Sequence, residues 1–133
     1  MTPDTLNFII IDDSKLDCFI AEKIIRNTGR AGDIKAFTNA SLGLEFISTT
    51  PAPEGAKTMI LLDIQMPVMN GFDFIEAFEQ LPAEIKEGYN VYMLSSSINE
   101  NDLNRVKNYP SIKQFLNKPL TSSTLTSILA ILG

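Results

Sequence analysis

The sequence predicts an α/β fold in which one parallel β-sheet is covered by helices on both faces. Two observations lead to this prediction. Five short apolar runs alternate with five stretches that have helical spacing or helix-capping residues. The runs are continuously apolar, as in strands buried on both sides, and strands that alternate with helices are joined by right-handed crossovers. At 133 residues, without a repeat or a linker, we expect one domain.

The first part of the chain supplies two strands and two helices. Phe8–Ile11 is the first apolar run, and Ser14 is a good N-cap for a helix that extends to about Thr28 and ends at Gly29. A stripe at helical spacing along this helix consists of Ile20, Ala21, Ile24 and Thr28. Ile34–Phe37 is the second strand. Asn39 caps a second helix, whose apolar residues are Leu42, Leu44, Phe46 and Ile47.

The rest of the chain supplies three strands and three helices. Thr58–Leu62 is the third strand, Gly71 begins a helix that extends to about Gln80, and Pro82–Gly88 is a long polar connection. The fourth strand is Val91–Leu94. The last elements are a short helix capped by Asn99 that ends at Tyr109-Pro110, the strand Ile112–Leu116, and a helix from the N-cap Thr121 to Leu132.

The composition excludes several classes of function. The net charge of −5 argues against non-specific nucleic-acid binding, which needs a basic surface. Without histidine, the chain has no Ser-His-Asp triad, no histidine metal site and no internal phosphohistidine. Cys18 is alone, so we expect neither a disulfide framework nor a thiolate metal cluster. The sequence has no apolar run that could span a membrane and no signal peptide over Met1–Asn7, so we expect a cytoplasmic protein.

Charged and hydroxyl side chains follow four of the predicted strands. They are Asp12 and Asp13, Asp63, Ser95 and Lys118. Because the carboxyl ends of parallel strands meet at one edge of the sheet, where ligands bind, these side chains converge. Three neighbouring carboxylates repel one another, and a bound Mg²⁺ resolves that repulsion. A carboxylate nucleophile, a metal ion, a lysine and a hydroxyl are the parts needed for phosphoryl transfer to an aspartate.

The motifs resemble those of the receiver domain of two-component response regulators, the CheY-like family. The resemblance covers essentially the whole chain and rests on four motifs in order: Asp12-Asp13, the block Asp63–Gly71 with Met66-Pro67 and Asn70-Gly71, Ser95, and Lys118-Pro119. It implies a doubly wound, flavodoxin-like (βα)5 sandwich with a five-stranded parallel sheet in the order 2-1-3-4-5. It also implies a cis peptide bond between Lys118 and Pro119.

The resemblance implies a role for each site residue. Asp63 would be the phosphoacceptor. Mg²⁺ would be held by Asp12, Asp13, Asp63 and the backbone carbonyl of Gln65. Lys118 would pair with the phosphoryl group, and the backbone N–H groups of Ile64 and Ser96 would bind it. Ser95 would hydrogen-bond the phosphoryl group after a shift that the Phe115 ring follows. Alanine is more usual in the family at position 96, and tyrosine is more familiar at position 115.

The resemblance also implies a function. We expect residues 1–133 to form a single receiver domain with no output domain, acting as a stand-alone response regulator. A histidine kinase or a histidine phosphotransfer protein would donate the phosphoryl group to Asp63 in a Mg²⁺-dependent step. The chain would not be an enzyme beyond its own phosphorylation and dephosphorylation. It would pass the signal to a downstream protein, a phosphorelay or a phosphorylation-dependent dimer, without direct DNA or membrane binding.

Two other classes stay open. A pseudo-receiver scaffold that is never phosphorylated typically lacks an acidic site residue or the lysine, and neither is lost here. An enzyme of similar architecture is the second class. An aspartyl-phosphate phosphatase needs an aspartate two residues after the nucleophile, where this chain has Gln65. A flavin carrier needs a phosphate loop after the first strand, where Asp12 and Asp13 would repel the phosphate.

Two helices carry more apolar or uncharged residues than one buried face requires. In the first helix, Leu16, Cys18 and Phe19 either wrap around the edge of the core or form a docking surface for a phosphodonor. In the last helix, the residues that suffice for a buried face are Leu125, Ile128, Leu129 and Leu132. The remaining residues, Ser122, Ser123, Thr126, Ala130 and Ile131, form either a surface for a partner or second copy, or a sparsely charged exposed surface.

Overall fold

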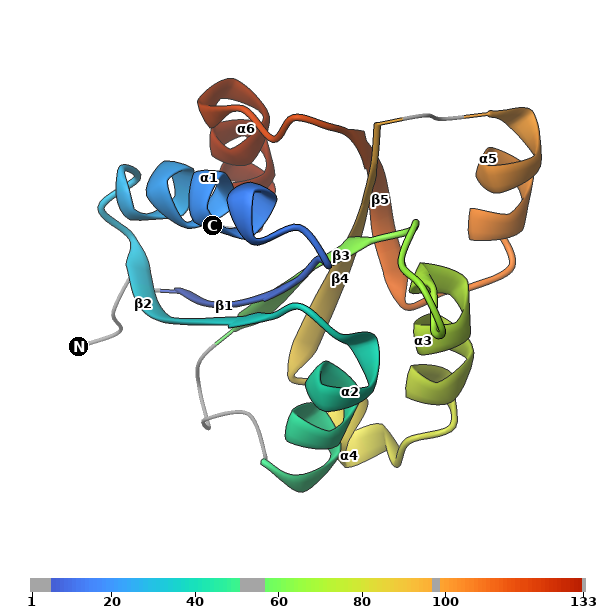
Figure 1. The fold of residues 1–133 in the computed structure, drawn as a ribbon. Coiled ribbons are helices and arrows are strands. Elements are labelled where there is room, and N and C mark those ends of the chain that lie inside the picture. Colours follow the sequence, from blue (N-terminus) through green and yellow to red (C-terminus); the bar gives the residue numbers. More distant parts are fainter. Residues whose placement is uncertain (1–5, 51–56, 97–98, 133) are drawn as a thin grey trace.

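One parallel sheet of five strands forms the centre of the domain. The computed structural model describes residues 6–50, 57–96 and 99–132, with side chains through residue 130. The strands are β1 Leu6–Ile11, β2 Ala31–Phe37, β3 Thr58–Asp63, β4 Tyr89–Ser95 and β5 Ile112–Asn117. They lie in the order β2-β1-β3-β4-β5, and all four neighbouring pairs are parallel (Figure 1). The predicted flavodoxin-like sandwich and its strand order are confirmed.

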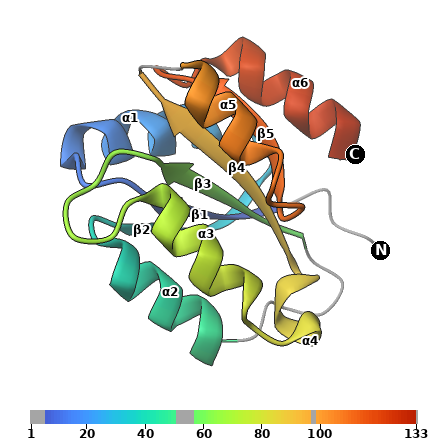
Figure 2. The same cartoon turned by 90° about the vertical axis from the view of Figure 1, so that its right-hand side faces the viewer.

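Helices cover both faces of the sheet. They are α1 Lys15–Arg26, α2 Ala40–Thr49, α3 Gly71–Glu79, α4 Ala83–Lys86, α5 Glu100–Val106 and α6 Ser122–Leu132. Helices α1 and α6 lie together on one face, whereas α2 and α3 lie on the other (Figures 1 and 2). Because every strand is parallel, the segments that follow β1, β3, β4 and β5 lie at the same edge of the sheet.

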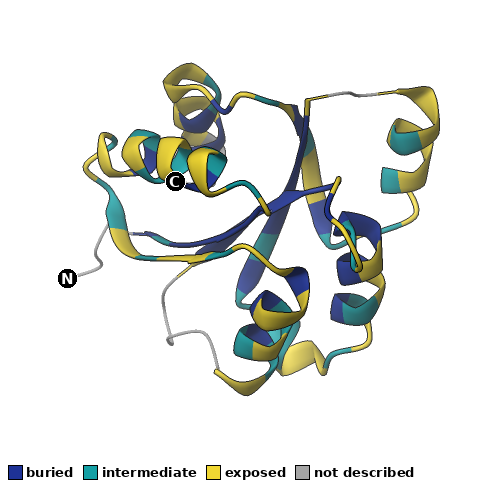
Figure 3. Cartoon of the chain, in the orientation of Figure 1, coloured by how far each residue is buried: buried dark blue, intermediate teal, exposed yellow. Residues whose placement is uncertain are grey.

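The central strands send alternate side chains into two separate cores. Ile9, Ile11 and Leu62 enter the core under α2 and α3, whereas Ile10 and Leu61 enter the core under α1 and α6. Strand β3 is buried at every position, and the edge strand β2 at none (Figure 3). A strand in the middle of a parallel sheet is covered on both faces, which explains the continuous apolar run in its sequence.

The helix starts follow from local sequence. The predicted N-caps Ser14, Asn39, Asn99 and Thr121 each accept a hydrogen bond from a backbone N–H three residues later, at 2.9 to 3.2 Å. At the start of α3, Asn70 and Asp73 form a reciprocal capping box that the sequence analysis did not identify. Gly29, at φ 72°, follows α1 in the left-handed conformation that favours glycine.

One expectation about the helices was wrong, and a second holds only in part. The connection Pro82–Gly88 contains the short helix α4, so the described residues hold six helices rather than five. In α1, the buried residues are Cys18 and Ile25, with Ala21 partly buried, whereas Ile20 is 38% exposed. Of the predicted stripe, Ala21 and Ile24 pack, partly buried, against the core under α1 and α6, so the prediction fails at Ile20 and missed Cys18 and Ile25.

The excess of apolar residues in α1 does not wrap into the core. Leu16 is 66% exposed and Phe19 is 59% exposed, so they form an apolar surface on the first two turns of the helix. Cys18, by contrast, is buried and belongs to the core under α1 and α6. No helix in the described ranges is both long enough and apolar enough to cross a bilayer.

Candidate functional site

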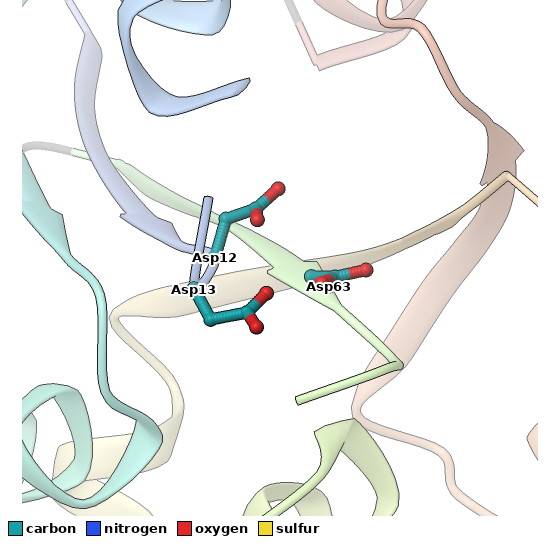
Figure 4. A group of neighbouring side chains, drawn as sticks. All are labelled: Asp12, Asp13 and Asp63. Carbon is teal, nitrogen blue, oxygen red and sulfur yellow. The ribbon is translucent and has the colours of Figure 1, made fainter. Parts of the chain in front are cut away.

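Three carboxylates meet at the carboxyl-end edge of the sheet. Asp63 is the last residue of β3, and Asp12 and Asp13 follow β1, which pairs with β3 (Figure 4). Asp63 is 6% exposed and Asp12 is 5% exposed, whereas Asp13 is exposed. One carboxylate oxygen of each residue lies within 4.8 Å of those of the other two. The sequence prediction that these residues converge is confirmed.

This group has the chemistry of a divalent cation site. A cluster of three carboxylates offers only oxygen ligands, which a hard cation such as Mg²⁺ prefers. Asp13 is open to solvent, so a cation bound there would keep water molecules, as Mg²⁺ commonly does. The residues therefore fit Mg²⁺, and they would hold it through Asp12, Asp13 and Asp63.

Lys118 lies among the acidic side chains. Its Nζ donates to the Asp12 carboxylate at 2.6 Å and to the Asp17 carboxylate at 2.9 Å, and it forms a longer ion pair with Asp63 at 3.3 Å. The Lys118–Pro119 peptide bond is cis, as predicted. The Lys118 backbone N–H donates to the Ser95 carbonyl at 2.9 Å, which fixes the start of the segment after β5 against the end of β4.

Asp17 is a site residue that the sequence analysis missed. It lies in the first turn of α1, and its backbone N–H donates to the Ser14 hydroxyl. The Ser14 backbone N–H donates in turn to the Asp12 carboxylate at 2.9 Å. The signal that could have placed Asp17 beside the site is its position in the first helical turn, three residues after the N-cap Ser14 and four after Asp13.

The electrostatics of the site follow from burial and from these contacts. Burial raises the pKa of Asp63 to about 6, with a further contribution from the Asp12 charge, even though Lys118 acts in the opposite direction. Burial alone would lower the pKa of Lys118, but its hydrogen bonds to Asp12 and Asp17 hold that pKa above the ordinary value. Lys118 is therefore a fixed positive charge, whereas the negative charge of Asp63 is destabilised.

The residues predicted to bind the phosphoryl group differ in their exposure and in their hydrogen bonds. Ser95 is 1% exposed at the end of β4, and Ser96 beside it is exposed. The Ile64 N–H, which we expected to bind a phosphoryl group, donates to the Leu94 carbonyl at 3.1 Å and so continues the β3–β4 pairing. The backbone N–H of the exposed residue Gln65 acts on the Asp63 carboxylate and lowers the pKa of that group.

The segment after Asp63 brings the backbone unusually close to the site. A Cβ atom on Gly71 would lie 2.8 Å from the Asp63 carbonyl oxygen and 2.9 Å from the Ile64 Cα, so only glycine fits. The Gly71 N–H donates to the Ile64 carbonyl at 2.8 Å. Val68 lies in the loop between Ile64 and Gly71 and is fully exposed. Its φ of 69° is unfavourable for a β-branched residue.

A cavity of about 290 Å³ opens beside the carboxylates, between α1 and the segment after β5. Its polar wall includes Asp12, Asp17, Asp63 and Lys118. Its apolar wall consists mainly of Ile10, Ile20, Ala21, Leu61, Leu94 and Leu120. The predicted switch residue Phe115 is absent from this lining and packs, partly buried, against the core under α2 and α3. The cavity gives a solvent-connected space next to Asp63.

Comparison with known proteins gives a consistent result. Residues 8–130 match the family model of the response regulator receiver domain. The chain is 27% identical to two-component response regulator 24 of Arabidopsis thaliana over 93% of this chain and 81% of that protein. A response regulator receiver protein from Dyadobacter fermentans has a structure with a TM-score of 0.86 and 32% identity, covering 96% of this chain and 97% of that one. A two-component response regulator from Cytophaga hutchinsonii also has a TM-score of 0.86, with 26% identity and 96% of each chain covered.

Proposed function

This chain belongs to the response regulator receiver domain family, and from that premise we propose that Asp63 accepts a phosphoryl group from a phosphohistidine donor in a Mg²⁺-dependent step. The observation that carries the proposal is the convergence of Asp63 with two further carboxylates and Lys118 at the end of β3. Members of the family are signalling domains, so the phosphorylated chain acts by changing its contacts with other proteins.

Asp63 is the best placed nucleophile of the three carboxylates. Both oxygens of Asp12 are engaged, one by the Ser14 N–H and the other by the Lys118 ammonium. Asp13 is exposed, so its carboxylate is well solvated and needs no partner. Asp63 borders the cavity, and burial raises the pKa of its carboxyl, which makes the carboxylate a stronger base and nucleophile.

The proposed step is an in-line displacement at phosphorus. A carboxylate oxygen of Asp63 forms a bond to phosphorus while the P–N bond to the donor imidazole breaks. The electron pair of that bond leaves with the imidazole nitrogen. Lys118, held near Asp63, pairs with the negative oxygens of the transferring group. Mg²⁺ held by Asp12, Asp13 and Asp63, with the Gln65 carbonyl, would neutralise the remaining negative charge.

We propose that the donor docks on α1. Leu16 and Phe19 are exposed on its first two turns, and Asp17 between them contacts Lys118 in the site. A partner that covers this apolar surface would bring its phosphohistidine to the mouth of the cavity. The partner would be a histidine kinase or a histidine phosphotransfer protein.

The proposed output surface involves β4, β5 and the last helix. Ser95 ends β4 opposite Asn117 of the neighbouring strand β5, and Phe115 lies two residues before Asn117. We propose that a shift of Ser95 toward the phosphoryl group is followed by the Phe115 ring. The neighbouring α6 buries Leu125, Ile128 and Leu129, as predicted, and leaves Ser122, Ser123, Thr126 and Ala130 exposed without a charge among them. The predicted positions of the Ile131 and Leu132 side chains lie outside the described residues. We assign this uncharged face of α6, with parts of α5 and β5, to a downstream partner or a second copy.

The function can be tested by incubating the protein with Mg²⁺ and acetyl phosphate and measuring its intact mass. The wild type should gain one phosphoryl group that is lost at alkaline pH, and Asp63→Asn should gain none because an amide is not a nucleophile. Asp33→Asn, an exposed change on β2, serves as the matched control and should be phosphorylated normally. If the wild type gains no phosphoryl group under any Mg²⁺ concentration, the chain is a binding scaffold and the proposal is wrong.

A further inference from the structure

The Lys118 ammonium is held on the α1 side of the site. Its two short hydrogen bonds go to Asp12 at 2.6 Å and to Asp17 at 2.9 Å, whereas the distance to Asp63 is 3.3 Å. The side chains of Lys118 and Asp12 are 16% and 8% exposed, so water does little to weaken their contact, whereas Asp17 is 42% exposed and its contact with Lys118 is partly screened. A cation that must pair with a phosphoryl group on Asp63 is thus anchored to two other carboxylates.

Asp12 and Asp17 differ in what happens when a divalent cation binds. Asp12 belongs to the group of three carboxylates that can hold the ion, and a bound ion would draw its charge away from Lys118. Asp17 does not belong to that group and lies on α1 with 42% of its side chain exposed. With a cation bound, Asp17 is the carboxylate that still competes for Lys118.

The position of Asp17 is set by the start of α1. Its backbone N–H is held by the Ser14 hydroxyl at 3.2 Å, and the Ser14 N–H is held by Asp12 at 2.9 Å. An aspartate in the first turn of a helix also has its negative charge stabilised by the helix dipole. The backbone of Asp17 is therefore fixed beside the site, and its carboxylate is oriented by the hydrogen bond from Lys118.

We propose that Asp17 is a positioning residue that restrains Lys118 and slows phosphoryl transfer to Asp63. This inference rests on the proposed function of Asp63. The Asp17 carboxylate competes with the incoming phosphoryl oxygens for the ammonium, so Lys118 must leave part of its contact with α1 before it can stabilise the transferring group. The rate of phosphorylation is then set partly by a residue that touches neither the phosphoryl group nor the metal ion.

Three variants separate this role from a structural one. Asp17→Asn keeps the size and a hydrogen-bond acceptor but removes the charge. Asp17→Glu keeps the charge on a longer arm. Glu22→Gln is the matched control, because it removes one negative charge from the same helix at a residue that pairs with Arg26 instead of Lys118. All three are measured at saturating Mg²⁺ against a series of acetyl phosphate concentrations.

The maximal phosphorylation rate of Asp17→Asn should be about 5-fold above that of the wild type, the size expected for weakening one hydrogen bond between charged groups. Asp17→Glu should stay within about 2-fold of the wild type, since its carboxylate still attracts Lys118, and Glu22→Gln should match the wild type. A rate for Asp17→Asn that is unchanged or lower than the wild type overturns the proposal.

A second measurement does not depend on phosphorylation. In ¹⁵N-edited NMR spectra of the unphosphorylated protein, the Lys118 ammonium signal should shift and exchange faster with water in Asp17→Asn but not in Glu22→Gln. An unchanged signal in Asp17→Asn overturns the proposal even if Asp63 is phosphorylated normally. If the signal changes as expected but no variant is phosphorylated, the proposed function of Asp63 fails and the Asp17–Lys118 contact stands.

Discussion

Leu62 and Asp63 are neighbours on β3, and both are almost completely buried, yet burial acts on them in opposite ways. Leu62 is 0% exposed and packs in the core under α2 and α3. Asp63 is 6% exposed, and burial destabilises its charge. Within one residue, the strand passes from a position where loss of water stabilises the fold to one where it costs stability. The stability of the fold therefore comes from the core beneath the site, whereas the ionised carboxylate at the site reduces it.

The largest effect on the free energy of unfolding is expected for the core residue Leu62. Leu62→Ala should lower the free energy of unfolding by about 3 kcal/mol, because it removes buried methyl groups and leaves a cavity beneath the site. Urea denaturation followed by circular dichroism measures the loss. Leu103→Ala on α5, where the residue is 42% exposed, is the control and should cost much less. Equal losses at the two positions would contradict the assignment of Leu62 to the stabilising core.

Removal of the Asp63 charge should have the opposite effect on stability from removal of the Leu62 side chain. Asp63→Asn should raise the free energy of unfolding of the metal-free protein by about 2 kcal/mol at pH 7.5, since it removes a buried charge that Asp12 repels. The pKa of Asp63 is about 6 in the folded protein, against an ordinary value of 3.8. Between these values the folded state binds a proton more tightly than the unfolded state, so the cost of the charge grows as pH rises and is complete above about 6.

The stability gain of Asp63→Asn should therefore shrink as the pH is lowered through 6 and be lost below 3.8. Parallel urea titrations of the wild type and the variant across this range measure it. A difference between the two proteins that does not depend on pH would contradict the view that the ionised carboxylate is the source of the cost.

A smaller effect on stability is expected from Mg²⁺, because the ion offsets the charge repulsion that destabilises the site. At ten times its dissociation constant, Mg²⁺ should stabilise the wild type by about 1.4 kcal/mol, because it binds the clustered carboxylates of the folded state. A thermal melt with and without Mg²⁺ measures the shift. Asp13→Asn should show a smaller shift, whereas Asp33→Asn should respond like the wild type. A melting temperature that is the same with and without Mg²⁺ would contradict the proposed metal site.

The smallest effect on stability is expected on α6. Thr126 and Ala130 are exposed, so Thr126→Glu and Ala130→Glu should change the free energy of unfolding by no more than about 0.5 kcal/mol. Phosphorylation at Asp63 should also be unchanged. Binding to a partner, or self-association after phosphorylation, should weaken, which sedimentation or a pull-down with the identified partner can measure. Normal association in both variants would remove this face from the proposed output surface.

The fold could be predicted from sequence because its determinants are local. The apolar runs mark strands buried on both faces, and each predicted cap needs only a side chain and the backbone three residues later. The convergence of Asp12, Asp13, Asp63 and Lys118 followed from the rule that parallel strands end at one edge.

The features that sequence analysis missed depend on packing between distant segments. The buried side of α1 is decided by how the helix is rotated on the sheet, which buries Cys18 and Ile25 and leaves Ile20 exposed. Asp17 acquires its role only because Lys118, 101 residues away, reaches it. The short helix α4 lacks a side-chain N-cap, so the sequence contains no signal for its start.

The central claim is that the destabilised carboxylate of Asp63, and no other, receives the phosphoryl group. An acyl phosphate is reduced by borohydride to homoserine, so the modified position can be located by peptide mass spectrometry after phosphorylation with acetyl phosphate and Mg²⁺. The account predicts homoserine at position 63 alone. Homoserine at position 12, 13 or 17, or at no position in a protein that has gained a phosphoryl group, would contradict it.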